Sequence, residues 1–93
     1  MKANLDQLVF VAISIATRAA KEYLGKNQVN YTNEELAEAI KKKSVDAFEA
    51  AMKDAKDALD CGMGKVAEQT FALSMVAAGI QAAKSIQEKA NFL

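Results

Sequence analysis

The stretch QTFALSMVAAGIQAA, residues 69–83, decides the fold, because its fifteen consecutive residues contain no charged side chain. In and around it, apolar and small side chains recur every three or four residues, the spacing of neighbours on one face of an α-helix. They form two stripes: Val66, Thr70, Leu73, Val76, Ala77 and Ile80 on one face, and Ala67, Phe71, Met75, Ala78, Ala82 and Ile86 on another. The pattern predicts a helix over about Lys65–Phe92 that is covered on more than one side.

A helix of this length is too long for one small chain to cover. At about 1.5 Å per residue it measures about 42 Å, whereas a compact domain of 93 residues has a diameter of about 32 Å. We therefore expect the chain to assemble with copies of itself, as a two-fold dimer, the commonest homo-oligomer. The residues predicted to form the core or the interface are Phe71, Leu73, Val76 and Ile80.

A second helical region is predicted over Asn33–Asp60. Thr32 and Glu35 have the spacing of a capping box, and Tyr31 and Leu36 flank that cap at the spacing of a hydrophobic staple. The apolar stripe of the region changes phase near residue 43, after three consecutive lysines and before Ser44. One continuous helix and a break or kink near residue 43 are both compatible with this pattern.

A first helix is predicted over about Leu5–Leu24, with Gly25 as its stop. Phe10, Val11 and Ile13 lie off its main apolar stripe, so its middle is apolar most of the way round. The β-branched run Val9–Ile15 could also form a buried strand, but the rest of the chain offers no strand to pair with it.

The fold class is therefore all-α: one domain, residues 1–93, forming a small bundle of three to four helices completed by oligomerisation. Proline is absent and glycine occurs four times, which argues against a turn-rich all-β fold. Gly62 and Gly64 bracket the break before the last helix.

Charge and cysteine content place the chain in a broad class. Twelve basic and twelve acidic residues cancel, so no general attraction to nucleic acid or anionic lipid is expected. The single cysteine, Cys61, suggests a reducing, cytoplasmic setting. The short apolar run Leu8–Ile13 lies between Asp6 and Ser14, so we expect neither a signal peptide nor a membrane span.

The sequence offers little for catalysis, and we expect no enzyme, no cofactor and no metal. Histidine, the usual general base and metal ligand, is absent. Asp54, Asp57 and Asp60 follow one another at a spacing of three residues, which is typical of a solvated helix face. Cys61 falls at a helix C-terminus, where the helix dipole disfavours a thiolate.

Two short motifs resemble binding sites without meeting their requirements. Gly62-Met63-Gly64-Lys65 opens a helix, but the earlier glycine of a P-loop would fall at Leu59, and Val66 follows the lysine. Lys41–Lys43 is the only basic run. The stretch Glu35–Met52 around it faintly resembles a helix-turn-helix, but it lacks the usual glycine in the turn.

The leading hypothesis is a non-enzymatic, self-associating helical module that also binds another protein, of the kind common in bacterial, phage and mobile-element genes. One alternative is a small-molecule binder with a pocket between subunits, to which Tyr23, Tyr31 and Arg18 could contribute polar contacts. Another is a nucleic-acid-binding protein that uses Lys41–Lys43. No motif in the chain identifies a family.

Overall fold

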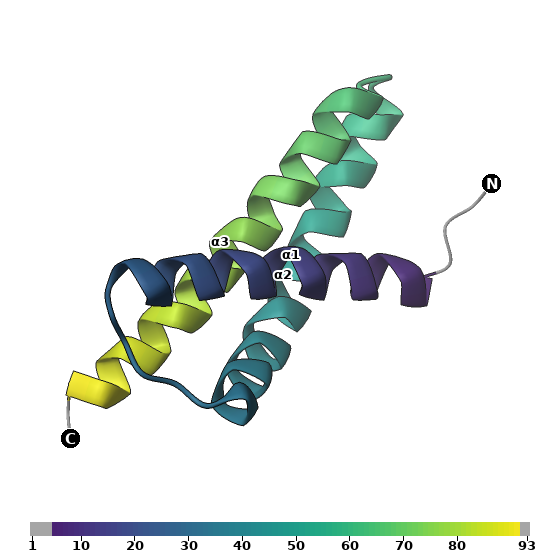
Figure 1. Ribbon diagram of the computed structural model, residues 1–93. Coiled ribbons are helices and arrows are strands. Elements are labelled where there is room, and N and C mark those ends of the chain that lie inside the picture. The colour runs from purple at the N-terminus through teal and green to yellow at the C-terminus, as the bar shows by residue number, and fades with distance from the viewer. Residues whose placement is uncertain (1–4, 92–93) are drawn as a thin grey trace.

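A computed structural model describes the backbone of residues 5–91 and the side chains of residues 10–90. Over these residues the chain forms three helices and no strand: α1 (Leu5–Lys26), α2 (Asn33–Asp60) and α3 (Gly64–Asn91) (Figure 1). The strand alternative for Val9–Ile15 is therefore wrong. Among residues 5–91, no helix combines the length and the hydropathy that crossing a bilayer requires.

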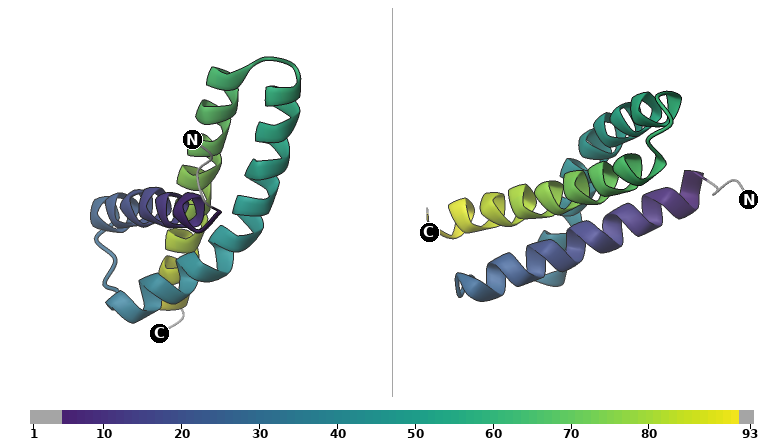
Figure 2. Two further views of the ribbon diagram at one scale, coloured as in Figure 1. Left: turned by 90° about the vertical axis from the view of Figure 1, so that its right-hand side faces the viewer. Right: turned by 90° about the horizontal axis from the view of Figure 1, so that it is seen from above.

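The helices form an elongated bundle. α2 and α3 run antiparallel as a long hairpin, and α1 lies across the hairpin near its middle (Figures 1 and 2). The principal extents are 48 × 20 × 18 Å, and the radius of gyration is 14.3 Å, against the roughly 12 Å of a compact domain of this size. The closed end of the hairpin projects beyond α1 (Figure 1), so α3 extends past the crossing of the helices, as its length of 28 residues leads one to expect.

The predicted cap starts α2. Thr32 adopts an extended conformation, and its side-chain oxygen accepts a hydrogen bond from the Glu35 backbone N–H at 3.1 Å. The Thr32 hydroxyl also donates to Glu35 Oε1 at 3.1 Å. Tyr31 packs against the cluster that contains Leu36, so both the cap and the apolar contact beside it are in place.

Thr32→Ala is expected to lower the free energy of unfolding by about 1 kcal/mol, because a helical N–H loses its partner. Thr32→Ser keeps an acceptor at the same position and should retain most of that stability. Urea unfolding followed by circular dichroism measures both variants. Equal stability of Thr32→Ala and the wild type would show that the hydrogen bond contributes nothing.

α2 is one continuous helix through residue 43. Its buried residues are Leu36, Ile40, Ser44 and Ala51, which share one face at spacings of four, four and seven residues. A single register therefore extends through the three lysines. The alternative of a break is wrong, and α2 bends along its length without interruption (Figure 2). Because the register does not change, Val45 lies off the buried face and is exposed.

The end of α1 differs from the prediction. Gly25 lies inside the last turn, and the left-handed residue is Gln28, with φ 54°. The Val29 N–H donates to the Leu24 carbonyl at 3.0 Å, and the Gln28 N–H donates to the Gly25 carbonyl at 3.3 Å. This is a Schellman motif, and Val29 and Leu24 meet in the same apolar cluster.

The turn between α2 and α3 is a second Schellman motif, here on the expected glycine. Gly62 has φ 73°. The Met63 N–H donates to the Ala58 carbonyl and the Gly62 N–H to the Leu59 carbonyl, both at 2.9 Å. A left-handed residue at this point is least costly as glycine, so the break predicted between Gly62 and Gly64 is present, and it is a tight turn.

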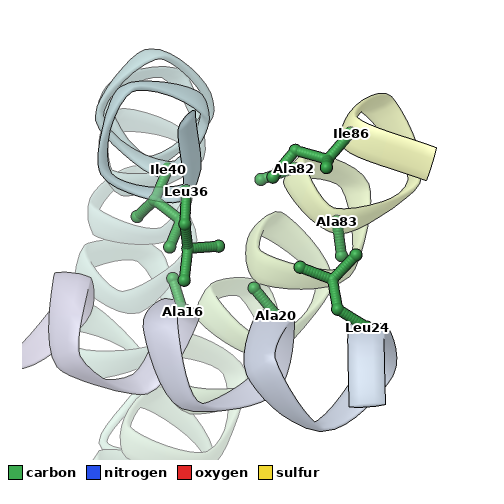
Figure 3. Packing of buried hydrophobic residues seen from close by; sticks show 8 residues of the cluster. All are labelled: Ala16, Ala20, Leu24, Leu36, Ile40, Ala82, Ala83 and Ile86. Carbon is green, nitrogen blue, oxygen red and sulfur yellow. The ribbon is translucent and has the colours of Figure 1, made fainter. Parts of the chain in front are cut away.

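The core lies where α1 crosses the hairpin. Side chains from all three helices point toward one another there: Ala16, Ala20 and Leu24 from α1, Leu36 and Ile40 from α2, and Ala82, Ala83 and Ile86 from α3 (Figure 3). A smaller cluster of Ala12, Ala51 and Met75 continues it. Among residues 10–90, eight of the thirteen buried hydrophobic residues are alanines, so the helix axes can approach closely.

Candidate interaction surfaces

The two apolar stripes of α3 have different environments. In the second stripe, Ala67, Met75, Ala78, Ala82 and Ile86 are buried against the other helices. In the first stripe, Leu73 is 69% exposed, Val66 46% and Val76 36%. We call Val66, Leu73, Val76 and Ile80 the outer face of α3. The chain itself therefore covers one stripe of this helix and leaves most of the other open.

The four residues predicted as core or interface divide along this boundary. Leu73 and Val76 are exposed, and Ile80 is half-buried. Phe71 lies in the second stripe and packs inside the chain, with its ring edge-on to Phe48 at a centroid separation of 6.1 Å and an interplanar angle of 82°. Three of the four are thus available in part to a partner, and Phe71 serves the internal packing of α2 on α3.

A second apolar surface runs along one side of α1 and continues between α1 and the first half of α2. Two shallow hollows of about 450 Å³ and about 440 Å³ share Ile13, Thr17 and Lys21 in their linings. Phe10 borders the first hollow and is 74% exposed. The second hollow is also lined by Asn33, Leu36, Ala37, Ile40 and Lys41.

The apolar residues off the α1 stripe mark part of this surface in the sequence. Phe10 and Ile13 are apolar, lie away from the α1 stripe and are exposed, so the described core does not cover them. Which residues of α2 lie opposite depends on how α1 crosses the hairpin. Sequence reasoning therefore found one wall of the surface without recognising it as a site.

The candidate chemical groups are dispersed. Asp54, Asp57 and Asp60 are all exposed, and among the described residues no group of three acidic, cysteine or histidine side chains could hold a metal ion. Cys61 is the C-cap residue of α2, and its thiol is free and exposed.

The polar residues suggested for a small-molecule pocket do not converge. The Tyr23 hydroxyl donates to Gln87 Oε1 at 3.0 Å, which joins α1 to α3. Tyr31 packs against the core cluster. Arg18 is exposed and pairs with Glu22, with its Nε 3.7 Å from Glu22 Oε1. Two of the three therefore serve the fold, and Arg18 lies apart from them on the surface.

The basic run does not form one patch. Consecutive residues of a helix point about 100° apart, and α2 is helical throughout Lys41–Lys43. Lys41 accordingly lines the hollow beside α1, whereas Lys43 lines a third hollow of about 350 Å³ between α2 and α3. This dispersal weakens the nucleic-acid alternative, which needs several cations on one face.

The glycine motif at the hairpin turn is explained by backbone geometry. Gly62 takes the left-handed conformation of the Schellman motif, and Gly64 is the first residue of α3.

Comparison of the chain with protein-family models, with curated proteins and with solved structures found no match in any of the three.

Proposed function

We propose that this chain is a non-enzymatic helical module that self-associates by pairing the outer face of α3 with the same face of a second copy. The observation that supports it most is Leu73, which is 69% exposed in the middle of a stretch of fifteen residues without a charge. A fully buried leucine or valine side chain contributes about 1.5–3 kcal/mol relative to an exposed one. Burial of this face against a second copy would therefore contribute substantially to the free energy of association.

The charge pattern favours a second copy as the occupant. In a two-fold interface the same surface meets itself, so a residue near the axis lies close to its own counterpart. A charged residue there would repel itself, and no charged residue occurs between Gln69 and Ala83. The outer face therefore has the composition that self-pairing requires.

The side-chain sizes suggest a register. If two α3 helices pack antiparallel around an axis between Val76 and Ala77, Leu73 of one copy lies beside Ile80 of the other. Ala77 is exposed and small, so the two helices can approach closely at the centre. The same dimer would juxtapose further surfaces for binding another protein, which is the accessory role we propose for the assembly.

Leu73→Glu tests the proposal. Light scattering on a sizing column over a hundredfold dilution should give a wild-type mass near twice the 10.0 kDa of one chain at the highest concentration. Leu73→Glu should give the monomer mass throughout, because each copy would bury a carboxylate beside Ile80 of the other. Leu73 is exposed in the monomer, so the variant should keep its helical circular dichroism spectrum.

Gln81→Glu is the matched control. It places the same carboxylate on the same helix at an exposed polar position outside the outer face, and its mass should follow the wild type. A wild-type monomer at every concentration, or identical masses for Leu73→Glu and the wild type, would contradict the proposed interface.

A further inference from the structure

One face of α1 is left partly open by the side chains that the structure describes. Phe10, Ile13, Thr17 and Lys21 are spaced at i, i+3, i+7 and i+11, which places them along one side of the helix. All four line the hollow on this side. The Thr17 hydroxyl donates to its own helix, to the Ile13 carbonyl at 2.7 Å, so the polar atom of the middle residue is already satisfied.

The opposite wall belongs to α2. Asn33, Ala37 and Lys41 are spaced four residues apart and line the second hollow, with Leu36 and Ile40 below them. The first hollow is lined by α1 alone, and it adjoins the second along Ile13, Thr17 and Lys21. We call the two adjoining hollows the trough. The α1 row from Phe10 to Lys21, which lines the first hollow, is about 17 Å long at the helical rise.

The charges at the trough are mainly positive. Three cations, Arg18, Lys21 and Lys41, and one carboxylate, Glu22, line the two hollows. Glu22 is already paired with Arg18, so Lys21 on one wall and Lys41 on the other are left flanking an apolar floor. An occupant that complements this surface is apolar along its centre and negatively charged along its edges.

We propose that this trough binds an amphipathic helix of another protein, with a narrow apolar face and acidic residues flanking it. The proposal concerns α1 and α2 and is independent of the self-association proposed for α3. The bound helix would pack its apolar face against Phe10, Ile13 and Ala37, and its acidic flanks would lie near Lys21 and Lys41.

The shape of the trough favours a helix over a compact ligand. Of the three helix pairs, α1 and α2 touch each other least, so their facing sides leave the most room for a further helix. The 17 Å row matches about three helical turns. Recognition of such a helix uses anchors at i, i+3, i+4 and i+7 in an apolar groove.

The probes are two synthetic peptides of fourteen residues with an identical leucine face. One has glutamates flanking the leucines, and the other has lysines at the same positions. Fluorescence anisotropy with labelled peptides at low salt is expected to give at least tenfold tighter binding for the acidic peptide. Raising the salt should reduce that preference, because exposed charges are screened within about 10 Å at 0.1 M.

The variant pair K21E/K41E should reverse the preference, so that the basic peptide binds more tightly. K42E/K43E is the matched control: it makes the same charge change at two exposed lysines of α2 that do not line the trough, and it should keep the wild-type preference. Ala37→Glu should weaken the acidic peptide at least tenfold, because it puts a like charge and added bulk on the wall. All variants are at exposed positions, and circular dichroism verifies that they fold.

Several results would overturn the proposal. Equal binding of the two peptides would show that the trough has no preference for acidic flanks. An equal loss of preference in K21E/K41E and K42E/K43E would show that the overall charge of the protein, and not the trough, causes it. Stabilisation by dodecanoate with no peptide binding would assign the trough to a small amphiphile. A change of solution mass in K21E/K41E would assign it to a second copy. Because Leu73→Glu should leave peptide binding intact, failure here and failure of the α3 interface are distinguishable.

Discussion

Replacing Gly79 by alanine is expected to destabilise the fold by about 1–3 kcal/mol, the usual cost of overpacking a close contact. A Cβ at this position would lie 2.9 Å from both the Ala16 Cα and its carbonyl carbon, and closer still to the carbonyl oxygen. These are backbone atoms of α1, so no side-chain rotation can relieve the clash. α1 would have to move away from α3, and the buried alanines between them would lose contact.

The expected loss of stability in Gly79→Ala is informative, because helix propensity alone predicts that the substitution stabilises the protein. In a helix interior alanine is more favourable than glycine by about 1 kcal/mol. Gly25→Ala is the matched control: Gly25 is helical, has no positive φ, and a Cβ there would meet nothing within 4 Å. Gly25→Ala should raise the free energy of unfolding by about 0.5–1 kcal/mol. Chemical denaturation of the two variants should move in opposite directions; a shift in the same direction would contradict the close approach of α1 and α3.

Leu24→Ala is expected to lower the free energy of unfolding by about 2–5 kcal/mol. Leu24 is fully buried where the three helices meet, beside Ala83 and Ile86 of α3. The change removes apolar contact and leaves a cavity, because small alanines around it cannot expand to fill the space. It also removes the contact with Val29 that accompanies the end of α1.

Leu73→Ala provides the comparison, since it is the same substitution at a leucine that is 69% exposed. Measured at a concentration at which the chain is monomeric, it should change stability by no more than about 0.5 kcal/mol. At higher concentration it should weaken self-association. A large loss of monomer stability in Leu73→Ala would mean that the outer face of α3 is covered by the chain itself.

Local signals in the sequence were sufficient for much of the fold. The cap at Thr32 and the turn at Gly62 were predictable because each depends on a few neighbouring residues and their backbone hydrogen bonds. The long apolar stretch of α3 also predicted a helix with two apolar faces. Sequence reasoning could not say which face the chain would cover, because that depends on how α1 crosses the hairpin.

The features that were missed depend on contacts between distant parts of the chain. The end of α1 moved from Gly25 to Gln28 because Val29 packs with Leu24 and the rest of the core cluster, which stabilises a left-handed glutamine. The continuity of α2 through residue 43 follows from Leu36, Ile40 and Ala51 being buried on one face. The trough between α1 and α2 needs both walls, and only one of them was visible as apolar residues off the main stripe.

Because one end of the hairpin projects beyond the core, the molecule has two regions that differ in local stability. From Met52 to Ser74, beyond the crossing with α1, Ala67 is the only side chain that is buried. Local opening costs least where few apolar contacts must be broken. Fluctuations that separate the ends of α2 and α3 can therefore occur while the crossing at Ala16 and Gly79 stays closed. The crossing of the helices is thus the more stable part of the molecule. At the hairpin end, α2 and α3 can change their spacing while the core stays folded.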